Sequence, residues 1–321
     1  MASKTTSIPV LDFYGDGLEP GTPSWAQLSA EVGHAAREFG CFEALWPTSV
    51  ADRQLLFPKI KEVFALPVET KRKNVYEDPL SGYNGPHRPF TNLESLGING
   101  ADSLQGVEDF TNVLWPQGNP DFSEAVYLFL KKLSEFGGIV SRMVLENLGV
   151  EKYHDGLMET LDCHVRMMHY KHPLNGVSRI EGLGAHADSN FLTILFQDEV
   201  NGLEVLNKQG QWIPVLPSPN SLIVIVGVTL VAWANERIHA PLHRVSMIGE
   251  KDRYSMALFM MSKAGKMVRT PEELVDEQHP LIFKPFDYFK FRRMYLSEFE
   301  RFNLSNPSEA CLAALKEYAG I

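Results

Sequence analysis

The sequence predicts a mainly β protein whose β region lies between two helical regions. From residue 163 to 261, short runs rich in β-branched and aromatic residues alternate with turn residues, which is typical of a barrel or a sandwich. Upstream and downstream, apolar residues recur at helical spacing. The 321 residues, 44% of them hydrophobic, suffice for a large core, and we expect one domain. Within it we expect a helix-rich part at 1–150, a β core at about 160–262 and helices at 285–319.

The first part of the chain contains strand and helix signals that follow one another closely. Residues 8–13 form a short strand-like run. Ser24 is a suitable N-cap for the helix that follows, and Gly40 would end that helix. We expect a second strand at 41–45 and a second helix at 50–65, which a Leu-Pro pair stops.

A less regular segment separates these elements from the next helix. Residues 76–120 are rich in Gly, Pro and Asn, so we expect long loops there that could close over a site. Helical periodicity returns at 121–148, and an aromatic helix around 286–295 could form a second lid. In the β region the expected strands are 164–170, 192–196, 203–206, 212–216, 222–226, 244–247 and 254–260.

Charge and cysteine content exclude several classes of protein. The chain has 30 Lys and Arg against 40 Asp and Glu, a net charge of −10, so it lacks the excess of cations that binding to nucleic-acid phosphates requires. No apolar run reaches the roughly 18–20 residues of a membrane span, and the first residues lack the apolar core of a signal peptide. Three widely spaced cysteines favour a reducing compartment. We expect a cytoplasmic protein that acts as a monomer on a small molecule.

The strongest chemical signal is a histidine and an aspartate two positions apart. Alternate residues of a strand share one face, so a strand beginning here would present His186 and Asp188 side by side. Such a pair is common by itself, but His243 lies at the start of a later expected strand. Two imidazoles and one carboxylate are the donor set that holds Fe(II) and leaves positions open for oxygen and a co-substrate. His239 is a rival third ligand, which we place second because it lies in the preceding loop.

A cationic side chain follows on the last expected strand. Arg253 and Ser255 would share one face, and a guanidinium with a hydroxyl is a good receptor for a carboxylate. The apolar residues that follow indicate a strand buried on both faces, where an arginine needs an anion. Tyr170, on the expected strand 164–170, could donate its phenol to the same carboxylate.

The combination of these motifs resembles the plant-type 2-oxoglutarate- and Fe(II)-dependent dioxygenases over roughly residues 7 to 305. Within that family the chain is most similar to the clade of enzymes that modify glucosinolates or hydroxylate steroidal alkaloids. The motifs are His186-x-Asp188, His243-Arg244-Val245 and Arg253-x-Ser255, supported by Ile8-Pro9-Val10-Leu11-Asp12, Phe39-Gly40-Cys41-Phe42 and Asn201-Gly202-Leu203-Glu204-Val205.

The resemblance implies a double-stranded β-helix, or jelly roll, that binds Fe(II), 2-oxoglutarate and O2. It implies hydroxylation or desaturation of a small specialised metabolite with release of succinate and CO2, and ascorbate as the reductant in vitro. One departure is Met168, which stands where the family often has an asparagine that helps hold 2-oxoglutarate. The implied iron ligands are His186, Asp188 and His243, and the implied 2-oxoglutarate contacts are Arg253, Ser255 and Tyr170.

Substrate contacts are expected on the same face of the β core and in the segment before it. Phe259 and Met261 are equally compatible with plain core packing. Three other functions compete with the first: a 2-oxoglutarate-independent iron oxidase in which Arg253 holds a substrate carboxylate, a non-catalytic ligand-binding relative, and a zinc hydrolase. The candidate substrate contacts are Arg166, Phe110, Asn112, Phe259 and Met261.

Overall fold

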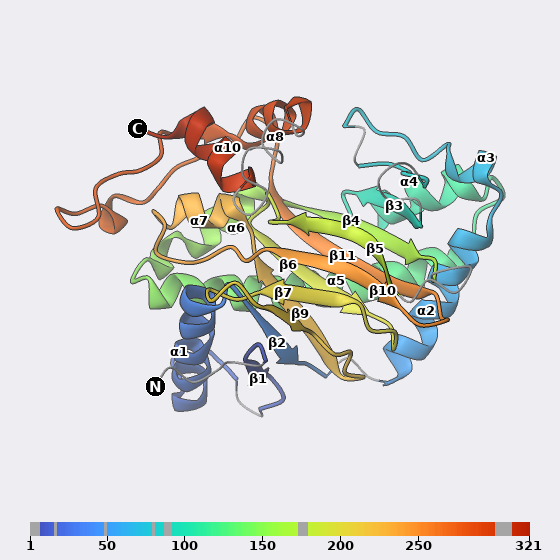
Figure 1. Cartoon of the computed structure of the whole chain (residues 1–321), viewed down its shortest axis with the longest axis horizontal. Helices are drawn as coiled ribbons and strands as arrows, with labels where there is room; N and C mark the ends of the chain where they lie inside the picture. Colours follow the sequence, from blue (N-terminus) through green and yellow to red (C-terminus); the bar gives the residue numbers. More distant parts are fainter. Residues whose placement is uncertain are drawn as a thin grey trace.

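Two β-sheets facing each other form the centre of the protein (Figure 1). The computed structural model describes residues 7–15, 18–47, 50–78, 81–86, 92–172, 179–298 and 310–321. All neighbouring strands are antiparallel except β1 and β2, which are parallel. This is the double-stranded β-helix that the family resemblance implies.

The larger sheet has seven strands and the smaller sheet has four. In spatial order the larger sheet consists of β1 (Val10–Asp12), β2 (Cys41–Leu45), β9 (Ser221–Val226), β6 (Leu192–Gln197), β11 (Arg253–Ser262), β4 (Leu161–Tyr170) and β3 (Leu93–Asn99). The smaller sheet consists of β5 (Arg179–His186), β10 (His243–Ile248), β7 (Leu203–Leu206) and β8 (Trp212–Pro214). A separate pair is formed by β12 (Met267–Val268) and β13 (Phe286–Asp287).

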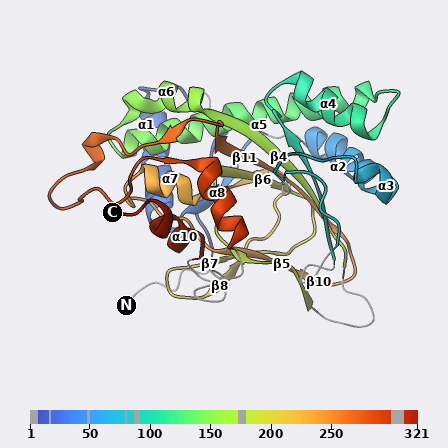
Figure 2. The same cartoon turned by 90° about the horizontal axis from the view of Figure 1, so that it is seen from above.

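Helices cover the outer face of the larger sheet (Figure 2). The long helix α5 (Pro120–Asn147) runs across that face, beside α1 (Pro23–Glu38) and α4 (Leu104–Leu114). Its apolar stripe packs on outward residues of the strands, because alternate strand residues point to opposite faces. The remaining helices are α2 (Val50–Ala65), α3 (Val68–Lys71), η1 (Glu151–Tyr153), α6 (His154–Thr160), α7 (Val228–Trp233), η2 (Glu272–Leu274), α8 (Tyr288–Ser297) and α10 (Ala310–Ala319).

The two faces of the larger sheet belong to two separate apolar clusters. On β4, Met167 points outward to the helices, whereas Met168 and Tyr170 point inward to the smaller sheet. There they meet Val245 and Met247 of β10. The inner face is therefore the wall of the space between the sheets, and the site residues on β4, β6 and β11 are placed by this alternation.

The prediction of long loops at 76–120 is wrong in its second half. Strand β3 and helix α4 both lie there, and α4 begins at the N-cap Ser103, whose hydroxyl accepts from the Gly106 N–H. Strand β3 completes the larger sheet, to which β1 and β2 also belong. The helix-rich part at 1–150 thus contributes three strands to the β core.

The N-terminal helix begins slightly earlier than the sequence indicates. Its N-cap is Thr22, whose hydroxyl accepts from the Trp25 N–H, and Ser24 lies inside the first turn. Gly40 ends this segment with φ +67°, and a Cβ at that position would overlap the His239 carbonyl oxygen. The strand at 41–45 and the helix at 50–65 have the expected bounds, the strand expected at 8–13 is limited to Val10–Asp12, and β5 was not among the expected strands.

Candidate active site

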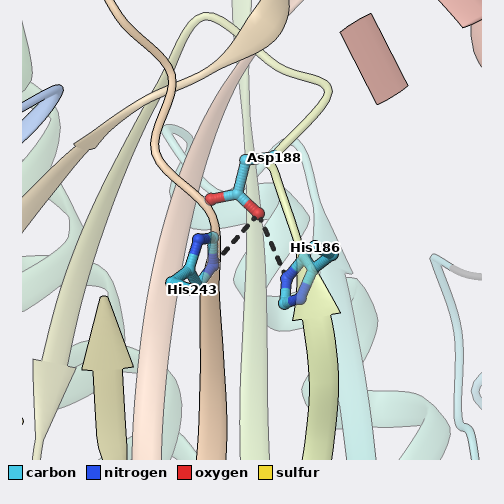
Figure 3. Close-up of side chains that lie close together, drawn as sticks. All are labelled: His186, Asp188 and His243. Atoms are coloured by element: carbon cyan, nitrogen blue, oxygen red, sulfur yellow. Dashed lines mark ion pairs between the residues drawn. The ribbon is translucent and has the colours of Figure 1, made fainter. Parts of the chain in front are cut away.

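Two histidines and an aspartate meet at the end of the smaller sheet (Figure 3). His186 is the last residue of β5 and His243 the first of β10, and the two are register partners. Asp188 lies beyond the end of β5, so the prediction that it shares a strand face with His186 is wrong. Asp188 lies in the segment that follows β5. That segment is held by a hydrogen bond in which the Asp188 carbonyl oxygen accepts from the Val228 N–H at 2.8 Å.

Each of the three side chains places one potential ligand atom close to the ligand atoms of the other two. Asp188 Oδ1 lies 3.6 Å from His186 Nε2 and 3.6 Å from His243 Nε2. The three ligand atoms all lie within 4.8 Å of one another, and this is the sole such group among the residues that the structure describes. His239, the rival ligand, is not part of it.

The other polar atoms of these side chains are already bound. His186 Nδ1 donates to the Gly184 carbonyl oxygen at 2.8 Å, and His243 Nδ1 faces that of Pro241 at 3.4 Å. In the neutral rings with the proton on Nδ1, both Nε2 atoms are without a proton, which is the form that a metal binds. Asp188 Oδ2 accepts from the Thr193 hydroxyl at 2.6 Å, which leaves Oδ1 free. The residues present thus fit a divalent transition metal with three protein ligands.

Burial and mutual charge set the protonation of this group. Burial alone would raise the pKa of Asp188, but the two imidazoles and Thr193 hold it well below its usual range. Burial, followed by the neighbouring His186, lowers the pKa of His243 to about 4. A carboxylate and a neutral imidazole are the forms that bind a metal.

Arg253 lies deep between the sheets, as predicted from the burial of its strand. It is 1% exposed, and its Nη1 donates to Ser255 Oγ at 3.2 Å. Nη2 donates to Gln197 Oε1 at 2.9 Å, and Nε is buried with no partner. No carboxylate of the described residues forms an ion pair with it, so a buried cation with an unused donor fits the carboxylate of a bound anion.

Tyr170 lies directly beside this guanidinium. The Arg253 Cζ is 5.1 Å from the Tyr170 ring centroid, and the two residues are register partners on β11 and β4. The Tyr170 hydroxyl donates to Met168 Sδ at 3.3 Å. Met168, the residue noted above as a departure from the family pattern, is thus in contact with the phenol. Gln197, which no sequence motif marks, also belongs to this site.

Three of the candidate substrate residues lie on the inner face of the larger sheet. Phe259 is the register partner of Thr193, whose hydroxyl binds Asp188, and Met261 follows two positions later on the same face. Arg166 lies on the neighbouring β4 strand, where Nε and Nη2 donate to Ser95 Oγ. Its contact places the guanidinium on the wall between the metal-ligand group and β3.

The other two candidates lie in the helical layer. Phe110 of α4 is 1% exposed and packs against Phe122 of α5, with 6.0 Å between ring centroids. Asn112 is exposed on the same helix. These positions contradict a role for either residue in the space between the sheets, because α4 packs on the outer side of the larger sheet (Figure 2).

Helix α8, the aromatic helix of the sequence, reaches the site through one side chain. Tyr288 is 1% exposed, and its hydroxyl lies 3.2 Å from Ser189 Oγ, next to Asp188 in the chain. The same hydroxyl donates to Met261 Sδ at 3.3 Å. Tyr288 therefore joins the C-terminal helices to both the metal-ligand loop and the substrate wall. Nothing in the sequence distinguished it from the other aromatic residues of α8.

Comparison with known proteins gives consistent matches along the chain. Residues 161–262 match the family model of the 2OG-Fe(II) oxygenase superfamily, and residues 8–125 match that of the non-haem dioxygenase in morphine synthesis N-terminal region. A probable 2-oxoglutarate-dependent dioxygenase from Arabidopsis thaliana, AOP1, is 42% identical over 301 residues, which cover 92% of this chain and 99% of that protein.

Solved structures agree with the sequence matches. The rice dioxygenase for auxin oxidation is 31% identical with a TM-score of 0.77, over 91% of this chain and 96% of that one. The Arabidopsis thaliana dioxygenase for auxin oxidation in complex with 2-oxoglutarate is 26% identical with a TM-score of 0.76, over 85% of this chain and 100% of that one.

None of the helices in the described ranges combines the length and apolar character that crossing a bilayer requires.

Proposed function

The chain belongs to the 2OG-Fe(II) oxygenase superfamily, and on that premise we propose which metabolites it oxidises and which residues do the work. It is a 2-oxoglutarate-dependent Fe(II) dioxygenase that releases succinate and CO2. We propose that it hydroxylates or desaturates a small specialised metabolite. The observation that supports this most is the convergence of three ligand atoms at the end of the smaller sheet, together with a guanidinium buried between the sheets whose Nε has no partner.

In this proposal His186, Asp188 and His243 hold the iron. When bound, Fe(II) with 2-oxoglutarate and O2 supplies the oxidising power that attacks an unactivated C–H bond. The backbone carbonyls of Gly184 and Pro241 orient the two imidazoles. Thr193 fixes the carboxylate, so that the ligands need no rearrangement on binding.

Arg253, Ser255 and Tyr170 bind the distal carboxylate of 2-oxoglutarate in this proposal. Arg253 offers Nε, which has no protein partner, and two further donors whose present partners are neutral. Binding a carboxylate there would neutralise a charge that burial otherwise penalises. The positions of Arg253 and Tyr170 on adjacent strands fix the direction in which the co-substrate lies.

The substrate then occupies the inner face of the larger sheet. Phe259 and Met261 provide an apolar wall beside Thr193, and Arg166 provides a cation. Burial lowers the pKa of Arg166 to about 10, which leaves it charged at neutral pH. Its guanidinium donates to Ser95 Oγ and to the Gly82 carbonyl oxygen, and in this proposal it also meets a polar or anionic group of the substrate.

We propose that the enzyme acts in the cytoplasm as a monomer. Its three cysteines are buried free thiols, which supports a reducing compartment. The net charge of −10 supports a small-molecule rather than a nucleic-acid partner.

A metabolite screen tests the proposal. The purified protein is incubated with Fe(II), 2-oxoglutarate, ascorbate and single plant metabolites, and succinate is measured together with the mass of each metabolite. We expect succinate to accompany a gain of about 16 mass units or a loss of about 2, as hydroxylation or desaturation requires. The Asp188→Ala variant serves as the inactive control. Failure of the protein to bind iron, or product without succinate, would contradict the proposal.

A further inference from the structure

A neutral side chain of β6 holds the guanidinium that the proposed function assigns to 2-oxoglutarate. Gln197 is the last residue of β6, is buried, and is the register partner of Ser255 on β11. Its side chain therefore lies on the inner face, one strand away from Arg253. Arg253 Nη2 donates to Gln197 Oε1 at 2.9 Å. A guanidinium has only donors, so the amide oxygen, and not the amide nitrogen, faces Arg253.

The main chain of Gln197 is anchored from helix α2. Arg53 Nη1 donates to the Gln197 carbonyl oxygen at 2.6 Å, and Arg53 Nη2 donates to that of Ser218 at 3.0 Å. The Arg53 Cζ also lies 4.9 Å from the ring centroid of Phe196. Because these contacts fix the backbone at the end of β6, Gln197 holds Arg253 from a fixed position.

The contacts of Arg253 leave its charge uncompensated. Gln197 Oε1 is neutral, and Arg253 Nε is buried without a partner. Asp198 attracts the guanidinium at longer range, but its two carboxylate oxygens accept from the backbone N–H groups of Val200 and Tyr254. Among the described acidic residues none forms an ion pair with Arg253. The buried cation is thus oriented by neutral groups and not paired with an anion.

An amide at this position has a different consequence from a carboxylate. A buried arginine that contacts neutral acceptors keeps a desolvation cost, which an entering anion offsets. Glutamate has the shape of glutamine, and at position 197 its carboxylate would form an ion pair with Arg253 within the protein. That pair would compete with a dicarboxylate for the same donors. Gln197 orients the guanidinium without neutralising it.

We propose that Gln197 is a positioning residue for 2-oxoglutarate: it orients Arg253 through a neutral hydrogen bond and leaves the cation available to the distal carboxylate of the co-substrate. This role rests on the proposed function, because it takes Arg253 as the receptor of that carboxylate. It adds a requirement that the Arg253-x-Ser255 motif does not contain, which is an uncharged acceptor on the neighbouring strand.

Two oxo acids that differ only at the distal end test this role. 2-Oxoglutarate and 2-oxopentanoate share the 2-oxo acid group and the length of the carbon chain, but 2-oxopentanoate has a methyl group in place of the distal carboxylate. Binding of each to the anaerobic Fe(II) enzyme is measured by calorimetric titration, without turnover. We expect the wild type to bind 2-oxoglutarate about 100-fold more tightly, because the analogue lacks the charge-assisted hydrogen bonds to Arg253.

Substitutions of Gln197 should lower this ratio of the two Kd values. Gln197→Glu adds a carboxylate in the same shape, and we expect the ratio to fall at least about 10-fold because Arg253 is already neutralised. Gln197→Met removes only the acceptor, and we expect a fall of about 3- to 10-fold, the value of one hydrogen bond. Gln209→Glu adds the same charge at an exposed glutamine between β7 and β8, and this control should keep the wild-type ratio.

The same titrations separate this role from folding. 2-Oxopentanoate binds through its metal-chelating end, so both Gln197 variants should bind it as the wild type does. In thermal unfolding, 2-oxoglutarate should raise the Tm of Gln197→Glu less than that of the wild type, because stabilisation by a ligand follows its affinity. A merely structural role of Gln197 would weaken both oxo acids equally and leave their ratio unchanged.

The results distinguish failure of this role from failure of the proposed function. An unchanged ratio in Gln197→Glu overturns the role of Gln197, and if that variant does not fold, an unchanged ratio in Gln197→Met overturns it. Equal affinity of the wild type for the two oxo acids overturns the assignment of Arg253, and the role of Gln197 with it. The proposed function fails separately, through absence of iron binding or through product without succinate.

Discussion

Replacing Arg253 with methionine should separate binding of 2-oxoglutarate from folding. The guanidinium is 1% exposed and its contacts are with the neutral groups Ser255 and Gln197. The substitution removes a buried cation that has no ion-pair partner among the described residues, and this stabilises the protein. It also leaves the acceptors of Ser255 and Gln197 without a donor, and this destabilises it. We expect these effects to offset each other, so that the protein without co-substrate stays within about 2 kcal/mol of wild-type stability.

The effect on 2-oxoglutarate should be much larger. Hydrogen bonds to a charged group contribute about 1.5–3 kcal/mol each, and Arg253 can donate at least two to a carboxylate. After the cost of desolvating that carboxylate, we expect a net loss of about 3 kcal/mol, which corresponds to about a 100-fold weaker Kd. At a concentration of 100 times the wild-type Kd, stabilisation by the ligand would fall from about 2.7 to about 0.4 kcal/mol.

Thermal unfolding with and without 2-oxoglutarate measures both quantities in one assay. The protein is kept anaerobic with Fe(II), and the Kd is confirmed by titration. Arg179→Met is the control, because Arg179 is an exposed arginine of the smaller sheet that pairs with Glu204. A Kd within about threefold of wild type in Arg253→Met would refute the assignment of Arg253 as the co-substrate receptor.

Three further substitutions test the surroundings of the site. Thr193→Val removes the hydroxyl that binds Asp188 Oδ2. The affinity for the metal, measured by competition with a chelator, should fall about 10- to 100-fold. An unchanged affinity would show that Thr193 does not orient Asp188. Tyr288→Phe removes the hydroxyl contacts to Ser189 and Met261. The free energy of unfolding, measured in urea, should fall by about 1 kcal/mol. An unchanged value would mean that packing alone holds α8. His164→Phe removes a group whose folded pKa of about 3 lies below the unfolded value, so the unfolded chain gains a proton first and wild-type stability falls as pH falls. Between pH 7 and 5, His164 should account for about 2 kcal/mol of the unfolding free energy that the wild type loses. An equal loss in the wild type and in His164→Phe would contradict a neutral His164 in the folded protein.

Regular apolar patterns explain why most elements were predictable. The strand at 203–206 and the helix at 50–65 have the bounds that the sequence indicates, because a continuous pattern and a clear stop signal mark each of them. Strand β3 was missed for a physical reason. Its outward residues Leu96 and Ile98 are buried, but the intervening Gly97 and its polar neighbours break the apolar run that a doubly buried strand usually shows.

The metal ligands were predictable by type but not by geometry. His186, Asp188 and His243 form the group that the motif indicates, yet Asp188 reaches it from a loop. Thr193 and Gln197 could not be found from the sequence, because their roles depend on register with strands distant in the chain. A motif specifies residue types, whereas register decides which neighbours orient them.

The residues that made β3 hard to predict are also those that contact the polar side chains of β4. A sheet face that only has to pack against another sheet is usually apolar, and on this face β3 instead presents Ser95, Gly97 and Asn99. Ser95 accepts from Arg166, Asn99 orients His164, and Gly97 leaves room for that ring. Because each of the three contacts a side chain of the neighbouring β4 strand, the polar and glycine positions of β3 are explained by the two polar side chains that β4 places on the inner face. The irregular sequence of β3 therefore reflects its pairing with β4 and not a loop.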